Sequence, residues 1–184
     1  MIRAFIAFEL PGEIKSLLGV LAAGLGQKAR GVKWVQPEGL HVTLKFLGAI
    51  EEGLVPLLSR ELDAIARQYP RFQVSLSRLG AFPDLERPRV IWAGLGGQTR
   101  AMGEIARKID MAGSRYGLEP EKKPFRAHIT IGRLKVPSVV DVAQEVKASP
   151  FTIEHIVLYK SELSPSGARY SVLHRSVLGQ DKGE

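Results

Sequence analysis

Two segments of the chain place a histidine and a threonine two residues apart within an apolar run. Residues 41–44 read HVTL and residues 128–131 read HITI. Successive side chains of an extended strand point to opposite faces, so His41 and Thr43 share one face, as do His128 and Thr130. A single H-x-T-x segment is also typical of a polar edge strand that faces water. Because the chain has only four histidines and four threonines, the repeat favours one site built from two halves.

Two such pairs facing each other across a cleft have the groups that acid–base chemistry requires. A neutral imidazole accepts a proton and a protonated one donates it, and both forms are accessible near neutral pH. A threonine hydroxyl can hydrogen-bond a phosphate oxygen. One histidine can therefore take a proton from water while the other protonates a departing alkoxide. This arrangement fits hydrolysis of a phosphodiester, particularly a strained cyclic one that needs no metal.

Other chemistries have less support in the sequence. Neither histidine motif has acidic residues nearby at ligand spacing, since Glu9, Glu38 and Asp84 form no local pattern with them, so no metal or cofactor is predicted. A serine hydrolase is disfavoured because the chain has no G-x-S-x-G elbow. The glycines of residues 94–97 lack the spacing of a phosphate-binding loop and predict a turn.

Composition narrows the class of protein. A chain of 184 residues with 45% hydrophobic content is long enough for one large domain or two small lobes. Its 26 Lys and Arg against 19 Asp and Glu give a net charge of +7, which favours polyanionic partners such as nucleic acid. The absence of cysteine excludes disulfides, thiolate metal sites and cysteine nucleophiles. No stretch approaches the roughly 18–20 apolar residues of a membrane helix. We therefore expect a cytoplasmic protein with no membrane partner, and a monomer by default.

Hydrophobic periodicity predicts a mixture of strands and helices. Helices are predicted over residues 11–25, 54–69, 99–115 and 139–147. Extended segments are predicted over residues 2–10, 34–35, 40–47, 72–77, 90–93, 128–131, 151–160 and 170–178, with a breaker-rich loop over 80–88. Residues 161–168 read as a polar loop that could reach the cleft. Because the elements follow no strict βαβ rhythm, an α+β fold with mostly antiparallel sheets is predicted.

The segments around the two motifs resemble the two-histidine (2H) phosphoesterases. Within that superfamily they resemble the RNA 2′,3′-cyclic phosphodiesterases, the LigT-like proteins also called 2′-5′ RNA ligases. The likeness runs in the expected order from Ile2 to Tyr170, and the segments that carry it are residues 34–38, 41–48, 88–94, 124–133 and 158–163. It implies a single bilobed α+β domain over residues 1–184, with two mostly antiparallel sheets around a central cleft and helices outside. It also implies metal-independent hydrolysis of an RNA 2′,3′-cyclic phosphate end, or of a cyclic nucleotide, to a 2′-phosphate.

The resemblance also implies roles for the motif residues. His41 would donate a proton to the departing 3′ oxygen and His128 would be the base that activates water. Thr43 and Thr130 would bind the phosphate. The division into acid and base depends on the resemblance alone, whereas the shared face of each histidine and its threonine follows from strand geometry.

The second motif departs from the family pattern on both sides. Ala127 stands where a proline often precedes the histidine, and Gly132 stands where alanine is common, so the course of this strand is open. Arg133 is predicted to make an additional phosphate contact, although alternation would place it on the face opposite His128. A salt-bridging arginine at a strand end is the alternative.

Five further residues are candidates for substrate contact. Phe46 and Trp92 could stack a base, although aromatic residues in apolar runs are usually core. Lys45 shares the face of His41 by alternation, so it is expected either to attract RNA or to be solvated. Tyr159 and Ser161 are candidates because their segment could reach the cleft.

Two other functions are compatible with the same residues. A 2′-5′ RNA ligase would run the same chemistry in reverse. A non-catalytic protein could use a basic cleft to hold RNA ends, although simple binding would be served better by Arg or Lys than by paired histidines.

Overall fold

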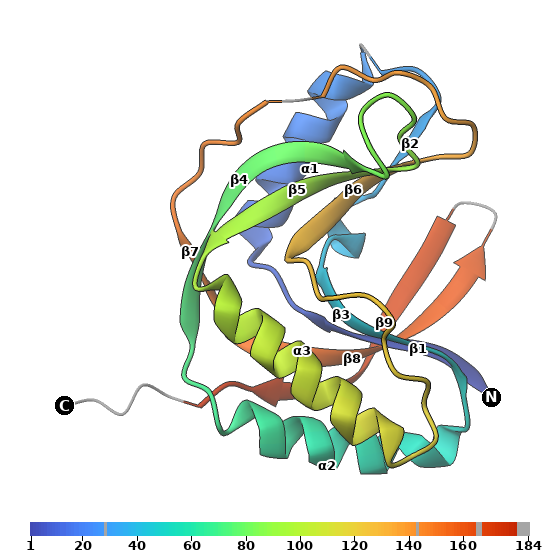
Figure 1. The fold of residues 1–184 in the computed structure, drawn as a ribbon, viewed down its shortest axis with the longest axis vertical. Coiled ribbons are helices and arrows are strands. Elements are labelled where there is room, and N and C mark those ends of the chain that lie inside the picture. Colours follow the sequence, from blue (N-terminus) through green and yellow to red (C-terminus); the bar gives the residue numbers. More distant parts are fainter. Residues whose placement is uncertain (28, 143, 165–166, 180–184) are drawn as a thin grey trace.

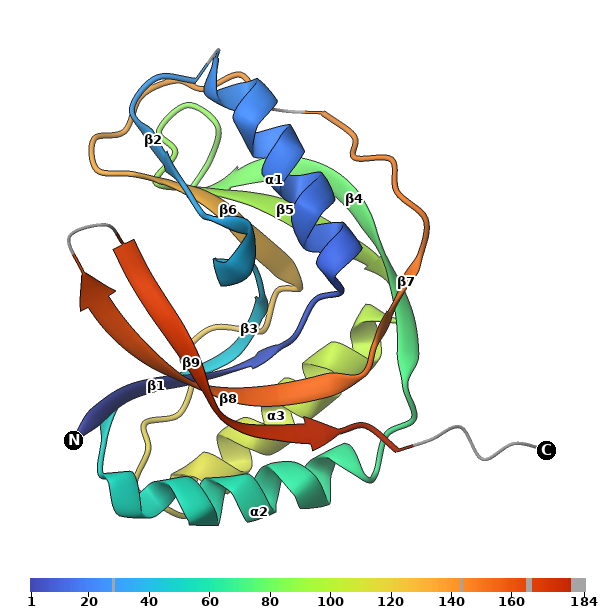
Figure 2. The ribbon, with the colours of Figure 1, turned by 180° about the vertical axis from the view of Figure 1, so that it is seen from behind.

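The computed structural model describes residues 1–27, 29–142, 144–164 and 167–179. These residues form two antiparallel sheets with α-helices on the outside (Figures 1 and 2). The four-stranded sheet has the order β3 (Val42–Ile50), β1 (Ile2–Phe8), β8 (His155–Ser164) and β9 (Gly167–Val177). The five-stranded sheet has the order β2 (Val32–Trp34), β6 (His128–Leu134), β5 (Val90–Gly97), β4 (Phe72–Phe82) and β7 (Phe151–Ile153). The predicted α+β fold with two antiparallel sheets is confirmed.

The helices form where the apolar residues recur at helical spacing. They are α1 (Gly12–Gly26), α2 (Val55–Ala66) and α3 (Thr99–Ser114), close to three of the four predicted ranges. Helix α1 buries Ile14, Leu18 and Leu25 on one face, as an amphipathic helix does. Figure 2 shows α1 lying across the five-stranded sheet, while α2 and α3 lie beneath the four-stranded sheet. The inner faces of the two sheets are thereby left for the site.

Strand β1 is buried on both faces from Ala4 to Phe8. Ile6 and Phe8 belong to the main hydrophobic core, whereas Phe5 and Ala7 form a second cluster with Val157 and Tyr159. The second cluster lies on the opposite face of the four-stranded sheet, because successive residues of a strand alternate. One face of this sheet thus packs on helices and the other carries aromatic residues.

The helix predicted over residues 139–147 is wrong. The described residues there are extended against the edge of β4: the Leu79 amide donates to the Gln144 carbonyl at 2.9 Å, and the Val146 amide donates to the Ser77 carbonyl at 2.7 Å. The segment is rich in valine, and β-branched side chains lose rotamer freedom in a helix but suit an extended chain. Burial of Val140, Val142 and Val146 at this edge overrides the weak helical periodicity.

Three segments predicted as loops or turns also contain strand residues. Strand β8 continues to Ser164 and β9 begins at Gly167, so residues 161–164 and 167–168 form a hairpin rather than a loop; residues 165–166 lie outside the described residues. The glycines of residues 94–97 belong to β5. The predicted loop over residues 80–88 begins only after Phe82.

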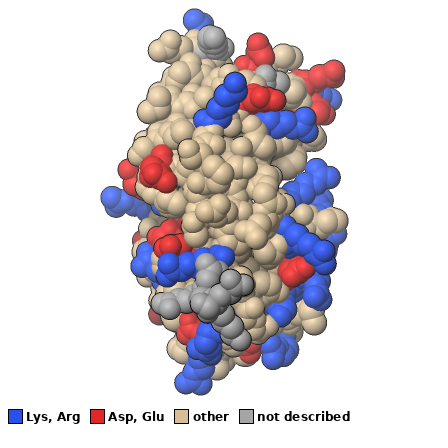
Figure 3. All heavy atoms as spheres, turned by 90° about the vertical axis from the view of Figure 1, so that its left-hand side faces the viewer, with Lys and Arg blue, Asp and Glu red and all other residues tan. Residues whose placement is uncertain are grey.

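Positive charge is unevenly distributed over the surface. Figure 3 shows many Lys and Arg side chains on the lower part of the molecule, where α2 and α3 lie, with several Asp and Glu side chains among them. Exposed arginines on α3 include Arg100 and Arg107.

Within the described part of the chain, no helix is long and apolar enough to cross a membrane.

Candidate active site

The two motif strands meet at a pocket of about 220 Å³ between the sheets. His41 directly precedes β3, and His128 is the first residue of β6. The pocket is lined by His41 and Thr43 from one motif and by Thr130 from the other. The intervening residues, Val42 and Ile129, are fully buried in the core. The structure therefore brings three of the four motif side chains to one pocket; His128 is not among the lining residues, but it is close enough for its charge to act on His41.

His41 is held by two hydrogen bonds. Its Nδ1 lies 2.7 Å from the Gly39 carbonyl oxygen and its Nε2 lies 3.1 Å from Thr43 Oγ1. Because a carbonyl only accepts, Nδ1 must carry a proton, and in the neutral ring Nε2 then accepts from the threonine hydroxyl. The nitrogen nearest Thr43 is thus the one that can gain or release a proton.

His128 repeats this anchoring. Its Nδ1 donates to the Arg126 carbonyl oxygen at 2.7 Å, which is again the carbonyl two residues earlier. In both motifs the carbonyl fixes the tautomer and leaves Nε2 for chemistry. The ring of Phe82 meets His128 edge-on, with centroids 5.2 Å apart. Both imidazoles are therefore oriented before any substrate binds.

Burial lowers the pKa of both histidines. The pKa of His41 falls to about 4, mainly by desolvation, and the positive charges of Lys15, Arg133 and His128 add to this effect. The pKa of His128 is lowered by burial and by the charges of Arg133 and Arg126. Both rings are thus neutral at pH 7 in the free protein. A phosphate anion between them would favour the protonated form and raise both pKa values.

Each motif strand contains a β-bulge immediately after the threonine. In β3, Thr43 pairs with Ala7 and Lys45 with Ile6, so Leu44 is an extra residue between two consecutive partners. Strand β6 has the same irregularity at Ile131, between Thr130 and Gly132. The sequence of buried, half-buried and exposed residues is the same over 41–47 as over 128–134. In both segments two successive residues at the bulge are buried, residues 44–45 and 131–132. A bulge shifts the alternation by one residue, so the faces after it are exchanged.

The bulge explains why the prediction for Lys45 is wrong. Alternation placed this residue beside His41, but its side chain is only 1% exposed and points to the core side of β3. Its Nζ lies 2.5 Å from Asp110 Oδ1 on α3 and 2.7 Å from the Glu119 carbonyl oxygen. Lys45 therefore fastens the motif strand to α3 and is not available to RNA.

The second bulge has the opposite consequence for Arg133. Simple alternation placed this residue away from His128, but the shift at Ile131 returns its side chain to the pocket, which it lines with Thr130. Gly132 occupies the place that Lys45 has in the first motif. A Cβ there would lie 2.7 Å from Val32 Cγ1, so the close approach of β2 explains glycine at this position.

Comparison with known proteins identifies the family. The model of the LigT-like phosphoesterases matches residues 8–92 and 96–170. The chain belongs to the LigT-like phosphoesterase family. It is 34% identical to the RNA 2′,3′-cyclic phosphodiesterase of Thermus thermophilus, over 98% of this chain and 92% of the relative. It is 32% identical to the protein of that name from Methanocaldococcus jannaschii, over 93% of this chain and 98% of the relative.

Solved structures of the family share the fold. The TT0787 protein of Thermus thermophilus superposes with a TM-score of 0.85 at 30% identity, covering 98% of this chain and 100% of that protein. E. coli LigT in complex with 3′-AMP superposes with a TM-score of 0.83 at 26% identity, covering 97% of this chain and 99% of LigT. These likenesses extend over both sheets and hence over both motifs of this LigT-like protein.

The remaining predicted residues of this LigT-like chain are arranged around His41. Phe46 returns to the pocket face after the first bulge and is 63% exposed at the rim. Ser161 also lines the pocket. Tyr159 does not; it is 9% exposed and stacks on Phe5 with centroids 5.2 Å apart. Burial raises the pKa of Tyr159 to about 12, so its hydroxyl stays protonated.

Several pocket residues were not predicted from the sequence. Phe5 lies 4.7 Å from the His41 ring and Tyr170 meets that ring edge-on at 5.4 Å. Arg3 also lines the pocket, and Phe82 packs on the other histidine. These residues lie in strands far from the motifs along the chain, and no local pattern marks them.

The described residues contain no group of three or more His, Cys, Asp or Glu that could hold a metal ion.

Proposed function

We propose that this LigT-like protein hydrolyses the 2′,3′-cyclic phosphate end of RNA to a 2′-phosphate. The observation that carries the proposal is the pair of oriented histidines, each with Nδ1 anchored to a carbonyl and each with a threonine on the same face. Relatives that share about a third of its residues over nearly the whole chain carry the name RNA 2′,3′-cyclic phosphodiesterase. Paired acid and base are what such a reaction needs.

The proposed reaction proceeds in one displacement. The phosphate is held by Thr43 and Thr130, whose hydroxyls donate to its oxygens, and by the guanidinium of Arg133. His128 takes a proton from water as the water oxygen attacks phosphorus. The bond to the 3′ oxygen breaks, and His41 supplies the proton to that oxygen. The 2′-phosphate and a free 3′ hydroxyl result, and proton exchange with solvent restores both rings.

Substrate charge gives His41 the proton it must donate. With a pKa of about 4, His41 is almost entirely neutral at pH 7 in the free protein. A phosphate anion beside the ring favours the charged form, because an opposite charge stabilises it. Binding of the cyclic phosphate and protonation of His41 are therefore coupled in the proposed mechanism.

The base of the terminal nucleotide has a candidate platform at the pocket rim. Phe46 exposes 63% of its surface there, and an exposed aromatic ring beside a phosphate site suits base stacking. Ser161 offers a hydroxyl to the ribose or phosphate. Tyr159 would act indirectly, by supporting the Phe5 ring against which His41 packs.

Product analysis tests the proposed function. The purified protein is incubated with a 2′,3′-cyclic nucleotide and with an RNA ending in a 2′,3′-cyclic phosphate, both in the presence of a chelator. Accumulation of the 2′-phosphate alone is the expected result. Failure to turn over either substrate, or formation of the 3′-phosphate, contradicts the proposal.

The roles of the two histidines can be separated with a modified substrate. Replacing the 3′ oxygen of the cyclic phosphate by sulfur gives a thiolate leaving group, which departs without being protonated. His41→Ala should then recover most of its lost rate on the sulfur substrate, whereas His128→Ala should not. Recovery of the His128 variant alone would reverse the assignment.

We further expect a monomeric enzyme that acts in the cytoplasm. Size-exclusion chromatography with light scattering tests the monomer, and fractionation of cells tests the location.

A further inference from the structure

A second aromatic surface adjoins Thr130 on the five-stranded sheet. Thr130 of β6 pairs with Trp92 of β5, and Trp92 pairs with Gly80 of β4, so the three form a row across the sheet. Directly opposed residues of antiparallel strands share a face. Trp92 therefore lies on the cleft side with Thr130, while its neighbours Ile91 and Ala93 are fully buried on the other side.

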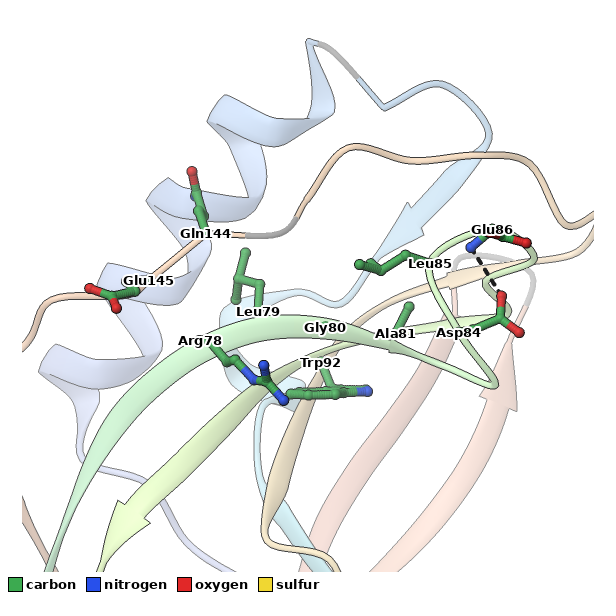
Figure 4. Close-up of a pocket in the computed structure, with 10 residues that line it drawn as sticks. All are labelled: Arg78, Leu79, Gly80, Ala81, Asp84, Leu85, Glu86, Trp92, Gln144 and Glu145. Atoms are coloured by element: carbon green, nitrogen blue, oxygen red, sulfur yellow. Dashed lines mark hydrogen bonds between the residues drawn. The ribbon is translucent and has the colours of Figure 1, made fainter.

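The indole of Trp92 lies flat on the sheet. A Cβ at Gly80 would lie 2.3 and 2.4 Å from Cζ2 and Cη2 of this ring, and one at Gly94 would lie 3.2 Å from Cζ3. Glycine in a strand often marks a place where another group approaches the backbone closely. One face of the ring is thus packed on glycine backbone, and the exposure of the half-buried ring comes from the other face. Figure 4 shows the ring edge-on, on the side of β4 opposite Leu79 and Ala81.

This surface is continuous with the second motif. The Phe82 ring lies between the two, with its centroid 5.3 Å from Trp92 and 5.2 Å from His128. The Arg126 guanidinium lies 5.8 Å from the centre of the Phe82 ring. Aromatic rings with an adjacent guanidinium are the combination that binds single-stranded nucleic acid without reading its sequence.

The aromatic surface ends at a mainly acidic groove on the side of Trp92 that faces away from Thr130. A groove of about 760 Å³ passes around the edge of β4 there, and its charged lining residues are Arg78, Asp84, Glu86 and Glu145 (Figure 4). Three carboxylates against one guanidinium repel a phosphate backbone. Neighbouring strands lie about 4.8 Å apart, so the indole, which extends from β5 over Gly80 of β4, covers the sheet from roughly 5 to 10 Å from Thr130, measured across the strands. That interval has room for one base.

We propose that Trp92 stacks the base of the nucleotide that precedes the cyclic phosphate-bearing nucleotide. The enzyme is then specific for RNA ends at least two nucleotides long, in preference to a cyclic mononucleotide. This inference rests on the proposed function, and it adds a substrate length: affinity improves from one nucleotide to two and no further.

Steady-state kinetics test the length preference. KM is measured for a cyclic mononucleotide and for di- and tetranucleotides ending in a 2′,3′-cyclic phosphate. KM should fall by about 5- to 150-fold from one to two nucleotides, matching the roughly 1–3 kcal/mol of base stacking on an aromatic ring, and should then stay level. Trp92→Leu should abolish the ratio between mono- and dinucleotide, and Trp92→Phe should keep most of it. Phe46→Ala should raise KM for both substrates alike.

A binding measurement makes the test independent of turnover. The chain has two tryptophans, so Trp34→Phe leaves Trp92 as the only one. Trp34 packs on β6 rather than in the row beside Thr130, which makes this variant a matched background. Titration with an ApA dinucleotide bearing a 2′-phosphate should quench Trp92 fluorescence, and 2′-AMP should not.

The outcomes distinguish this inference from the proposed function. Equal KM for mono- and dinucleotides, equal quenching by 2′-AMP, or no quenching by the dinucleotide each overturn the role of Trp92 while cyclic phosphate hydrolysis stands. Absence of turnover on every substrate overturns the proposed function, and the fluorescence titration still reports whether Trp92 stacks a base. A further fall in KM from dinucleotide to tetranucleotide overturns the limit of one additional base.

Discussion

The buried ion pair of Lys45 gives a test of how the first motif strand is held. Lys45 Nζ lies 2.5 Å from Asp110 Oδ1, and the lysine side chain is 1% exposed whereas that of Asp110 is 24% exposed. Asp110 also accepts a hydrogen bond from the Glu121 amide at 3.0 Å, so it can remain solvated and partnered without the lysine. The two partners therefore differ in what their removal leaves behind.

Asp110→Ala leaves a buried ammonium without its counter-charge, which costs about 3–5 kcal/mol of unfolding free energy. Lys45→Met removes the charge and keeps the volume, so the cost is about 1–2 kcal/mol, from an acceptor that water can reach. Because 1 kcal/mol shifts the midpoint of a chain this size by about 2–4 °C, Asp110→Ala should melt roughly 10 °C lower than wild type. The double variant Lys45→Met/Asp110→Ala should be more stable than Asp110→Ala alone, because it no longer contains the uncompensated buried charge.

Urea unfolding followed by circular dichroism measures these differences. Lys45→Met, once folded, should hydrolyse cyclic phosphate with unchanged KM, since the lysine does not reach the pocket. Equal destabilisation by both single variants would refute the argument from burial. A large rise in KM for Lys45→Met would restore the RNA-binding role that the structure contradicts.

Three further predictions follow from the site. Burial lowers the pKa of His41 to about 4 and also lowers the pKa of His128, so the free protein with one of the two histidines protonated is most populated below pH 6.5, and kcat/KM should peak there. Because bound phosphate raises the pKa of both histidines, kcat should peak at a higher pH than kcat/KM. A kcat/KM optimum above pH 7 would count against this prediction. Arg133→Ala should raise KM by roughly 10- to 100-fold through loss of a charged hydrogen bond, and an unchanged KM would exclude the phosphate contact. Gly132→Ala should lower the free energy of unfolding, measured with denaturant, by about 1–3 kcal/mol, because its Cβ would clash with β2. The control Gly24→Ala, whose Cβ would have no atom within 4 Å, should be neutral or stabilising, and equal effects of the two variants would contradict the close packing at Gly132.

The sequence predicted most of what depends on local periodicity. The three amphipathic helices and the shared face of His41 and Thr43 follow from spacing alone, since burial of an apolar stripe decides them. The face of Lys45 could not be predicted, because alternation holds only while a strand is regular. A bulge is produced by pairing with a strand distant in sequence, and the extra residue at Leu44 exchanges the faces of Lys45 and Phe46.

Tertiary packing decided the other elements that were missed. Residues 139–147 carry valines at a spacing that fits a helix, but β4 offers hydrogen bonds to Gln144 and Val146 in an extended form, and Val140, Val142 and Val146 are buried. Tyr170 reaches His41 only because β9 and β3 belong to the same sheet. Phe82 reaches His128 through the pairing of β4, β5 and β6. No local pattern reports contacts between residues so far apart in the chain.

The most direct test of the two-histidine account is the turnover of an RNA 2′,3′-cyclic phosphate by chelator-treated wild type, His41→Ala, His128→Ala and the double variant. The wild type should keep its full rate, and each single variant should lose at least about 10²-fold in kcat, as expected for loss of a general acid or base. The double variant should be little slower than the single ones, because the two groups act in one step. Undiminished kcat in either single variant, or a wild-type rate that disappears with the chelator, would contradict the account.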